Sequence, residues 1–336
     1  MGNKLILPEN YVSKLNLRET EQAIKLAKDL FERNLATALN LKRVSAPLYV
    51  KTQTGLNDDL NGTERPVSFD ILDIKAEVQI VHSLAKWKRM ALKKYGFKPG
   101  EGLYTDMNAI RRDESLDNLH SVYVDQWDWE TIISREERNI EKLKSFVKLI
   151  VSAIKETADT LSEQFPSLKQ NLTKDIHFVS SQELENEYPD KTPFERESEC
   201  SKKHGLIFVS QIGKTLKSGK RHDGRAPDYD DWELNGDIIY WSPILNRAVE
   251  ISSMGIRVDE KSLDSQLKSA NCDYRREYTF HKMLLNGELP LTIGGGIGQS
   301  RLCMLLLQKA HIGEVQVSVW PDKMTQICAE HGIVLL

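Results

Sequence analysis

The sequence predicts an α+β fold in which an antiparallel β-sheet is flanked by helices. Two long stretches, residues 16–39 and 140–165, repeat apolar residues at helical spacing. Two strand-like runs, residues 103–110 and 119–129, are separated only by the charged connection RRDESLDN. Such a pair predicts a β-hairpin with an extended, charged tip.

The amino-terminal part of the chain begins with a helix. Asn16 followed by Glu19 has the spacing of a capping box, which predicts a helix from there to about Leu39. The chain is then expected to be extended through LKRVSAPLYV, because Pro47 disfavours helix at the residue before it. Residues 55–66 are expected to form a polar loop.

The remaining elements are short apolar runs and helical stretches. Ser134 and Glu137 have the spacing of a second capping box, which predicts the start of the helix with the apolar stripe from Ile140 to Phe165. The other predicted elements are, in chain order, the strands FDILDI and EVQIVHS, the helix LAKWKRMALKKYG, the strands IHFV and GLIFVSQI with helices between them, the antiparallel strands LNGDIIYW and RAVEISSMGIRV, helices near 260–270 and 274–286, and a final helix after a glycine cluster.

The composition is that of a soluble globular protein. The chain has 336 residues, of which 40% are hydrophobic and 28% charged, which argues against disorder. The formal net charge of -3 gives no indication of a nucleic-acid partner. The amino-terminal apolar run is too short for a secretory signal, and no run approaches the ~20 residues that a membrane span needs. No internal repeat or linker is evident, so we expect a single domain over residues 1–336.

The four cysteines lie far apart in the sequence and include no Cys-x-x-Cys pair. This spacing argues against a zinc site and against a disulfide framework. It favours a reducing environment, and we therefore expect a cytoplasmic protein.

The strongest local signal for a ligand site is TIGGGIGQSRLCMLLLQ, residues 292–308. Its glycines let backbone approach a ligand without an intervening Cβ. The amino end of the apolar helix that follows attracts anions, and Arg301 on its first turn adds a cation. The pattern indicates a nucleotide or phosphate site, although a glycine-rich turn that only permits close packing has the same sequence. The four glycines are Gly294, Gly295, Gly296 and Gly298.

Two common nucleotide-binding motifs are excluded. A Rossmann turn needs glycine at the sixth position counted from Gly294, where the sequence has Gln299. The GKT at residues 213–215 resembles the end of a P-loop, but Phe208 stands where that motif needs its first glycine. If the chain binds ATP, it therefore holds the nucleotide in another way.

The returning strand of the hairpin is the second signal. A period of two places Gln126, Asp128 and Glu130 on one face of this strand. Trp127 and Trp129 then point to the other face. Consecutive polar positions on one face are a candidate site wall, and a solvated sheet face is the alternative.

In these segments the chain resembles the class II aminoacyl-tRNA synthetases. The hairpin near 103–130 is similar to motif 2, the segment near 292–309 is similar to motif 3, and the stretch near 24–50 is similar to motif 1, which forms the dimer interface in that superfamily. The runs VHSLAKWKR, LHSVYVDQWDWE, RHDGRAPDYDDW and EISSMGIRVD closely resemble the ammonia-dependent asparagine synthetase A (aspartate–ammonia ligase) family. The resemblance extends from about residue 15 to the carboxyl end.

This resemblance implies a two-step reaction. The side-chain carboxylate of L-aspartate attacks the α-phosphate of ATP, which gives β-aspartyl adenylate and pyrophosphate, and ammonia then displaces AMP to give L-asparagine. Adenylation supplies the leaving group that a carboxylate lacks. Because the attack brings anions together, the site needs cations and Mg²⁺.

The resemblance also implies roles for individual residues. Arg111 and Arg301 would contact the nucleotide from two sides, since the planar guanidinium suits phosphate. Asp237 and Glu250 would bind Mg²⁺, because carboxylate oxygens are its usual ligands. His82 is given no catalytic role, because a single histidine is more often structural. The residues implied for aspartate and ammonia are Asp58, Lys88, Gln126, Asp128, Asp230, Ser253 and Arg301. Those implied for the nucleotide are Arg111, Asp237, Glu250, Arg301 and the four glycines, and those expected to be catalytic are Arg111, Asp58, Lys88, Gln126 and Arg301.

The nitrogen donor is expected to be free ammonia. Glutamine-hydrolysing synthetases use an activated cysteine, commonly at the mature amino terminus. This sequence begins Met1-Gly2, and its first cysteine is Cys200. The expected assembly is a homodimer without nucleic-acid or membrane partners.

Two other functions fit parts of the pattern. The core of an aspartyl- or asparaginyl-tRNA synthetase would show a similar hairpin, but such enzymes need a tRNA-reading module, usually before the core, and no basic patch stands out. A non-catalytic paralogue that binds ligand and regulates a partner would be expected to have lost site residues. The sequence keeps Arg111, Gln126, Asp237, Glu250 and Arg301.

Overall fold

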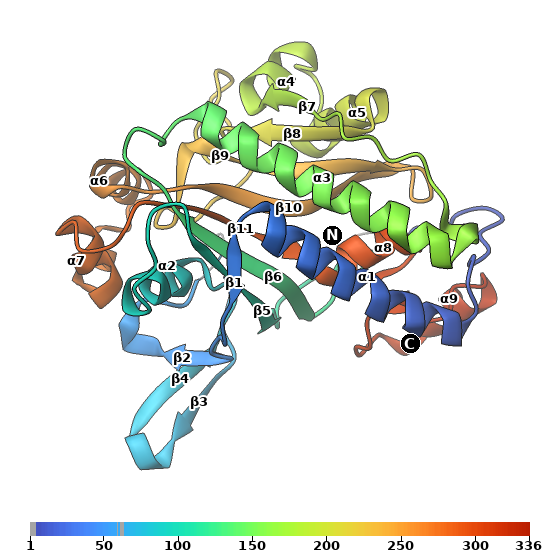
Figure 1. The fold of residues 1–336 in the computed structure, drawn as a ribbon, viewed down its shortest axis with the longest axis horizontal. Coiled ribbons are helices and arrows are strands. Elements are labelled where there is room, and N and C mark those ends of the chain that lie inside the picture. Colours follow the sequence, from blue (N-terminus) through green and yellow to red (C-terminus); the bar gives the residue numbers. More distant parts are fainter. Residues whose placement is uncertain (1–4, 59, 61–63) are drawn as a thin grey trace.

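The computed structural model describes residues 5–58, 60 and 64–336. Residues 1–4 of the predicted non-secretory terminus and residues 59 and 61–63 of the predicted polar loop lie outside the described parts. The large sheet has eight strands in the order β1-β5-β6-β11-β10-β9-β8-β7. A three-stranded sheet, β2-β4-β3, projects from the body of the protein (Figure 1).

The strands are β1 (Leu41–Arg43), β2 (Tyr49–Lys51), β3 (Ser68–Ile71), β4 (Ala76–Ile80), β5 (Gly102–Ile110), β6 (Tyr123–Ile132), β7 (His177–Ser180), β8 (Leu206–Ser210), β9 (Asp230–Ser242), β10 (Arg247–Arg257) and β11 (Thr292–Gly298). The α-helices are α1 (Leu17–Ala38), α2 (Ala85–Lys94), α3 (Ile140–Gln164), α4 (Ser181–Glu187), α5 (Pro193–His204), α6 (Glu260–Ser269), α7 (Thr279–Leu285), α8 (Gln299–Leu307) and α9 (Asp322–Glu330).

The large sheet is mixed. Its central strands, from β5 to β8, pair antiparallel as predicted. Both edge strands add parallel pairing, β1 with β5 and β7 with β8. Helices α4 and α5 connect β7 to β8, and such a crossover is what parallel neighbours require. The α+β prediction is therefore confirmed, and the parallel edges are a feature that the strand patterns did not indicate.

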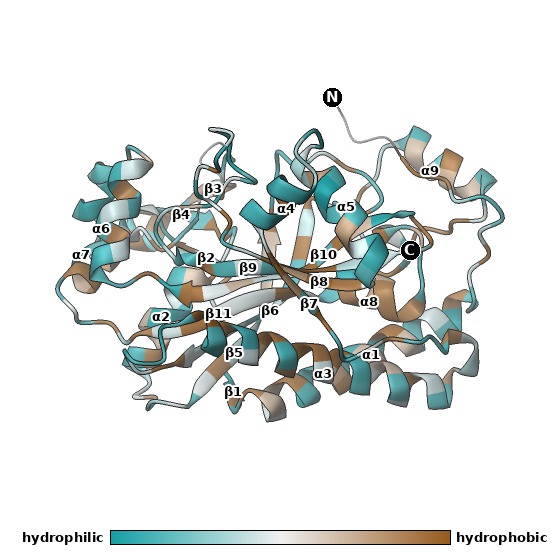
Figure 2. Ribbon diagram, turned by 90° about the horizontal axis from the view of Figure 1, so that it is seen from above, coloured by the Kyte–Doolittle hydropathy of each residue, from teal (hydrophilic) through white to brown (hydrophobic). Residues whose placement is uncertain are grey.

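Helices α1 and α3 lie side by side across one face of the large sheet (Figures 1 and 2). The indoles of β6 point toward them. Trp127 packs against Phe31 of α1 with ring centroids 4.9 Å apart, and Trp129 stacks on Phe146 of α3 at 5.5 Å. Such aromatic pairs add to the stabilisation that burial gives. The polar residues of β6 consequently face the opposite side of the sheet.

The two predicted capping boxes have different outcomes. At α1 the prediction is confirmed: the Asn16 side chain accepts the Glu19 N–H at 3.0 Å, and the Glu19 carboxylate accepts the Asn16 N–H at 2.9 Å. At α3 the predicted start is wrong. Glu137 does accept the Ser134 N–H at 2.8 Å, but the chain there forms a turn, and Asn139 caps the helix instead. A capping spacing satisfied locally does not require a helix to follow at once.

The glycine cluster also differs from its prediction. Residues Thr292–Gly298 form the central strand β11, between β6 and β10, and not a turn. The helix after them, α8, begins at Gln299 as expected. The four cysteines are all free, as predicted. Within the described ranges, every helix is too short or too polar to span a bilayer.

Candidate active site

A pocket of about 420 Å³ lies on the polar face of β6. The hairpin β5–β6, strands β10 and β11, the start of α8 and the segment 223–230 line it. Most of the residues implicated by sequence meet here, although they come from distant parts of the chain. Those that line the pocket are Lys88, Arg111, Gln126, Asp128, Asp230, Glu250, Ser253, Gly295, Gly296, Gly298 and Arg301. Asp58, Asp237 and Gly294 lie outside its lining.

The alternation predicted for β6 is confirmed. Gln126 and Asp128 line the pocket, while Trp127 and Trp129 belong to the core on the helical side. Glu130 continues the polar face but is fully buried. The polar face of β6 therefore lines the pocket at Gln126 and Asp128, and it takes part in a buried ion-pair network at Glu130.

The glycines of β11 leave room for the side chains of neighbouring strands. A Cβ on Gly296 would lie 2.5 Å from Gln126 Oε1 and 2.9 Å from Asp128 Oδ1. A Cβ on Gly294 would overlap the Glu130 carboxylate. None of the four has positive φ, so steric clearance and not backbone freedom requires glycine at Gly294, Gly295 and Gly296, whereas a Cβ on Gly298 would make only an ordinary contact. A strand without side chains forms a flat floor on which the polar groups of β6 can lie.

Two arginines reach the pocket from the segments that resemble motifs 2 and 3. Arg301 is on the first turn of α8, and its Nη1 lies 3.3 Å from the Glu250 carbonyl oxygen. Arg111 follows β5, and its Nη2 lies 3.5 Å from the His82 carbonyl oxygen. Its Nε is buried and has no hydrogen-bond partner among the described residues. Both guanidinium groups can therefore take an anionic ligand.

Asp237 and Glu250 lie on the adjacent strands β9 and β10, as predicted. Asp237 Oδ2 accepts a hydrogen bond from Arg225, while its Oδ1 is buried without a partner in the described part of the chain. Burial raises the pKa of Asp237 to about 7; Arg225 opposes this shift and the Glu250 carboxylate adds to it. The Glu250 carboxylate is near enough to raise the pKa of Asp237, and such a pair of acidic groups favours an added cation.

Lys88 of α2 joins the strands beneath the pocket. Its Nζ donates to Asp128 Oδ1 at 3.1 Å and to the carbonyl oxygens of Trp129 and Gly295, each at 3.0 Å. Burial lowers the pKa of Lys88, and Asp128 opposes that shift. The three N–H groups of the ammonium are thus all used within the protein, and they hold Asp128 against β11.

Asp58 and His82 form a separate contact beside the pocket. Asp58 Oδ1 accepts the Leu60 N–H at 3.0 Å, and His82 Nδ1 lies 2.9 Å from the Asp58 carbonyl oxygen. His82 is fully buried, and its backbone N–H donates to Asn57 Oδ1. These contacts hold the His82 ring and backbone against the loop that carries Asp58.

Arg257 is a site residue that the sequence did not single out. Its Nε and Nη2 donate to the two oxygens of Glu130 at 2.9 and 2.7 Å, and its Nη1 donates to Asp230 at 2.6 Å. Burial raises the pKa of Glu130, but Arg257 and Lys88 together hold it below its ordinary value. Arg257 also lines the pocket. Its only signal in the sequence was its place within EISSMGIRVD.

A second buried network, also unpredicted, fixes the segment that carries Arg225 and Asp230. Asp228 Oδ2 accepts from Lys86 at 3.2 Å and from Arg275 at 2.9 Å, and lies 2.9 Å from His281 Nε2. Burial raises the pKa of Asp228, but the charges of Lys86 and Arg275 and the hydrogen bond with His281 lower it well below its usual range. Because its partners come from α2 and the region of α7, sequence spacing gives no hint of the cluster.

Comparison with known proteins identifies the family. The family model described as aspartate-ammonia ligase matches residues 18–332. An aspartate–ammonia ligase of Ruminiclostridium cellulolyticum is 62% identical over 99% of this chain and 100% of that protein, and one of Clostridium tetani is 60% identical over 100% and 98%.

Solved structures agree at the level of the fold. The asparaginyl-tRNA synthetase of Pyrococcus horikoshii, complexed with asparaginyl-adenylate, matches 90% of this chain and 70% of its own with a TM-score of 0.65 and 14% identity. The aspartyl-tRNA synthetase of Entamoeba histolytica has a TM-score of 0.59 at 16% identity, over 90% of this chain and 58% of its own. The fold is therefore that of the class II aminoacyl-tRNA synthetase catalytic core, and the chain belongs to the aspartate–ammonia ligase family.

Proposed function

We propose that this carbon–nitrogen ligase makes L-asparagine, AMP and pyrophosphate from L-aspartate, ammonia and ATP through a β-aspartyl-adenylate intermediate. Its family membership supports the overall reaction. The order of steps follows from chemistry, because a carboxylate does not react with ammonia until it carries a good leaving group. The adenylate supplies AMP as that group.

One observation carries the nucleotide assignment: Arg111 and Arg301 converge on a single pocket beside a glycine strand. Arg111 has a buried Nε without a partner among the described residues, so an α-phosphate oxygen would satisfy it. Arg301 stands at the amino end of α8, where the helix dipole also favours anions. The pocket-lining glycines Gly295, Gly296 and Gly298 would let the nucleotide lie close to the sheet, whereas Gly294, also expected at the nucleotide, lies outside the pocket lining.

Aspartate is assigned to the side of the pocket formed by β6, β10 and the segment before β9. Gln126, Asp128, Ser253 and Asp230 line it. Positive charge for the substrate carboxylates would come from Arg301 and from Lys88, which already holds Asp128 in place. The carboxylates of Asp128 and Asp230 would face the substrate amino group or ammonia. Asp58 is included from its place in the family's pattern.

Mg²⁺ fits the pair Asp237 and Glu250. Hard carboxylate oxygens suit this ion, and the buried Oδ1 of Asp237 has no other partner in the described part of the chain. Bound there, Mg²⁺ would neutralise phosphate charge during adenylation. In its absence Arg225 compensates part of the acidic charge through its ion pair with Asp237.

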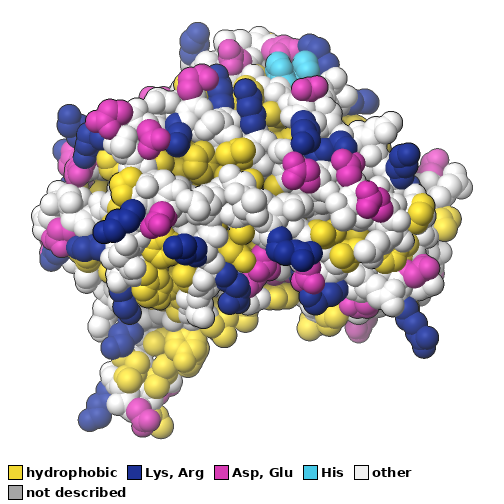
Figure 3. Space-filling view, in the orientation of Figure 1, with side chains coloured by type: hydrophobic (Ala, Val, Ile, Leu, Met, Phe, Trp, Pro, Cys, Tyr) yellow, Lys and Arg dark blue, Asp and Glu magenta, His cyan; other side chains and the backbone are white. Residues whose placement is uncertain are grey.

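The chain is proposed to act as one catalytic domain, residues 1–336, that forms a homodimer. The projecting sheet (Figure 1) supports the dimer, because it presents exposed apolar side chains (Figure 3). Such clustered side chains are typical of an interaction surface. They are Tyr49 and Phe69 on the strands, Leu48 directly before β2, and Leu72 and Ile74 in the turn that connects β3 to β4. Four free cysteines, three of them buried, support a reducing, cytoplasmic location.

A direct assay tests the reaction. The purified protein is incubated with L-aspartate, ATP, Mg²⁺ and ammonium, and asparagine, AMP and pyrophosphate should appear in equal amounts. ADP in place of AMP would exclude adenylation. Aminoacylated tRNA as the product would support the synthetase alternative, and ligand binding without turnover would support the non-catalytic one.

A further inference from the structure

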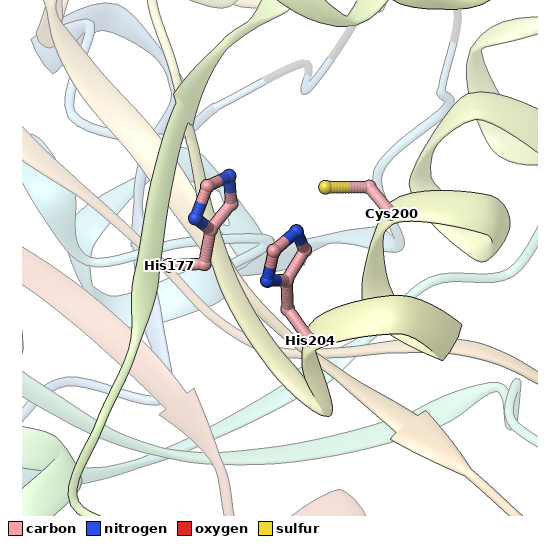
Figure 4. Close-up of side chains that lie close together, drawn as sticks. All are labelled: His177, Cys200 and His204. Atoms are coloured by element: carbon pink, nitrogen blue, oxygen red, sulfur yellow. The ribbon is translucent and has the colours of Figure 1, made fainter.

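Three side chains that commonly bind metals meet at the edge of the large sheet. Ligand atoms of His177, Cys200 and His204 all lie within 4.8 Å of one another (Figure 4). None of the three lines the active-site pocket. The cluster is therefore separate from the acidic pair proposed for Mg²⁺.

The local fold explains why these residues meet. Cys200 and His204 are four residues apart in α5, which places them on the same face of the helix. His177 is the first residue of β7, and it pairs in register with Ile207 of β8, directly after α5. The helix and the edge strand thus bring a Cys-x-x-x-His pair and a distant histidine together. The sequence had argued against a zinc site because its four cysteines lie far apart and include no Cys-x-x-Cys pair, a criterion that takes no account of histidine ligands.

The surroundings of His177, Cys200 and His204 leave their side chains available to bind a ligand. Cys200 is 2% exposed, whereas both histidines reach the surface. Within the described ranges, no hydrogen bond or ion pair engages the ring nitrogens of His177 or His204. The two rings stack with centroids 3.8 Å apart and an interplanar angle of 4°. Burial and the neighbouring His177 lower the pKa of His204, so its imidazole is neutral near pH 7.

We propose that His177, Cys200 and His204 bind a Zn²⁺ ion, with water as a fourth ligand. Zinc favours tetrahedral sites of thiolate sulfur and imidazole nitrogen, with bonds of about 2.0–2.3 Å. In such a site ligand atoms are roughly 3.3–3.6 Å apart. The ligand atoms here lie within 4.8 Å of one another, so they need to approach by at most about 1.5 Å. The stacked rings also need to turn, which the histidines can do by changing rotamer.

Binding converts the Cys200 thiol to a thiolate and releases one proton for each ion bound. Without metal the thiol is protonated near pH 7, because burial raises the pKa of Cys200 to about 11. The ion would link β7, an edge strand, to the end of α5. The ion would raise the stability of the protein, because a ligand that binds only the folded state stabilises it. It would take no part in the chemistry of the pocket, because its three ligands do not line that pocket.

The experiment is a zinc titration of the full-length, metal-free protein in excess Mg²⁺, which occupies hard carboxylate sites. A chromophoric chelator competes for the zinc and reports the affinity. The wild type should bind one Zn²⁺ per chain. His177→Gln and His204→Gln should each weaken zinc affinity by at least about 100-fold, because loss of a ligand costs more than loss of a residue that only hydrogen-bonds a ligand. The wild type should also gain thermal stability with zinc, and the two variants should not.

Control variants separate this site from general cysteine and histidine binding. Cys272→Ser and His331→Gln lie outside the cluster and should keep the wild-type affinity. With Co²⁺ as a probe, the wild type should show a thiolate-to-cobalt charge-transfer band that Cys200→Ser lacks. Unchanged zinc affinity in His177→Gln and His204→Gln would overturn the proposal, as would wild-type binding weaker than millimolar. Because both histidines are exposed, these variants test the site even if Cys200→Ser fails to fold.

Discussion

Gly294 of β11 lies against the carboxylate of Glu130 on β6, and the two residues are partners in the sheet register. A Cβ on Gly294 would overlap that carboxylate and would lie 2.7 Å from Nη2 of Arg257. The glycine therefore leaves the space in which the Glu130–Arg257 ion pair is buried.

Gly294→Ala should destabilise the protein by roughly 1–3 kcal/mol, because the added methyl group displaces buried charged groups that cannot move into solvent. Urea denaturation measures this free energy of unfolding. Gly298→Ala is the control, since a Cβ there would be 3.4 Å from its nearest neighbour, Arg301 Cβ. Equal losses in both variants would contradict the steric explanation.

Arg257→Met should cost about 3–5 kcal/mol of unfolding free energy, because it leaves Glu130 buried without its main partner. Arg135→Met removes the partner of Glu260 in an ion pair that is largely exposed, with the arginine side chain 57% accessible. That control should lose less than about 1 kcal/mol. If both variants lose a similar, small amount of unfolding free energy, burial does not make the Arg257–Glu130 pair more important for stability than an exposed pair.

Arg111→Ala should reduce aspartate-dependent ATP–pyrophosphate exchange by at least about 100-fold. The substitution removes a fixed cation that would stabilise the negative charge developing at the α-phosphate. Circular dichroism should show an unchanged fold. The neighbouring Arg112→Ala removes the same charge from an exposed position outside the pocket and should keep most of the exchange activity. Full exchange by the Arg111 variant would exclude this arginine from the mechanism.

The pH dependence of stability should include a contribution from Asp237. Its pKa is raised from 3.8 to about 7 in the folded protein, so the folded state binds the proton more tightly than the unfolded state. This contribution is fully present below about pH 4 and is lost as the pH rises through 7. Without Mg²⁺, Asp237→Asn should therefore show a smaller decrease in unfolding free energy between pH 4 and pH 8 than the wild type.

Asp223→Asn is the control for this measurement. It removes another partner of Arg225, but the Asp223 side chain is 64% exposed. The pH slope should remain that of the wild type. If Asp237→Asn also keeps the full slope, the raised pKa of Asp237 is excluded.

Leu72→Asp should weaken the proposed homodimer, because it places a charge within the exposed apolar side chains of the projecting sheet. Light scattering over a range of protein concentrations measures the change in dimer population. Val319→Asp offers a matched control, since Val319 is 84% exposed and Leu72 82%, but Val319 lies outside that sheet. A wild-type monomer at all concentrations would exclude the dimer, and an equal effect of both variants would exclude this surface as its interface.

Local patterns in the sequence determined much of the fold. The cap at Asn16 defined the start of α1, and the period of two placed Trp127 in the core and Asp128 at the pocket. These features depend on neighbours a few residues apart, so spacing and side-chain chemistry were enough. The family was also evident, because its motifs are contiguous runs.

The tertiary structure alone decided which distant groups share a site. The strand conformation of the glycine segment, the Arg257–Glu130 pair and the cluster of His177, Cys200 and His204 depend on pairings between elements far apart in the chain. Spacing within a short stretch of sequence cannot predict such contacts. They depend on the order of strands in the sheet and on helix packing, which follow from burial of the whole core. The sequence therefore identified the family, and the packing of the sheet determined which side chains meet at the pocket.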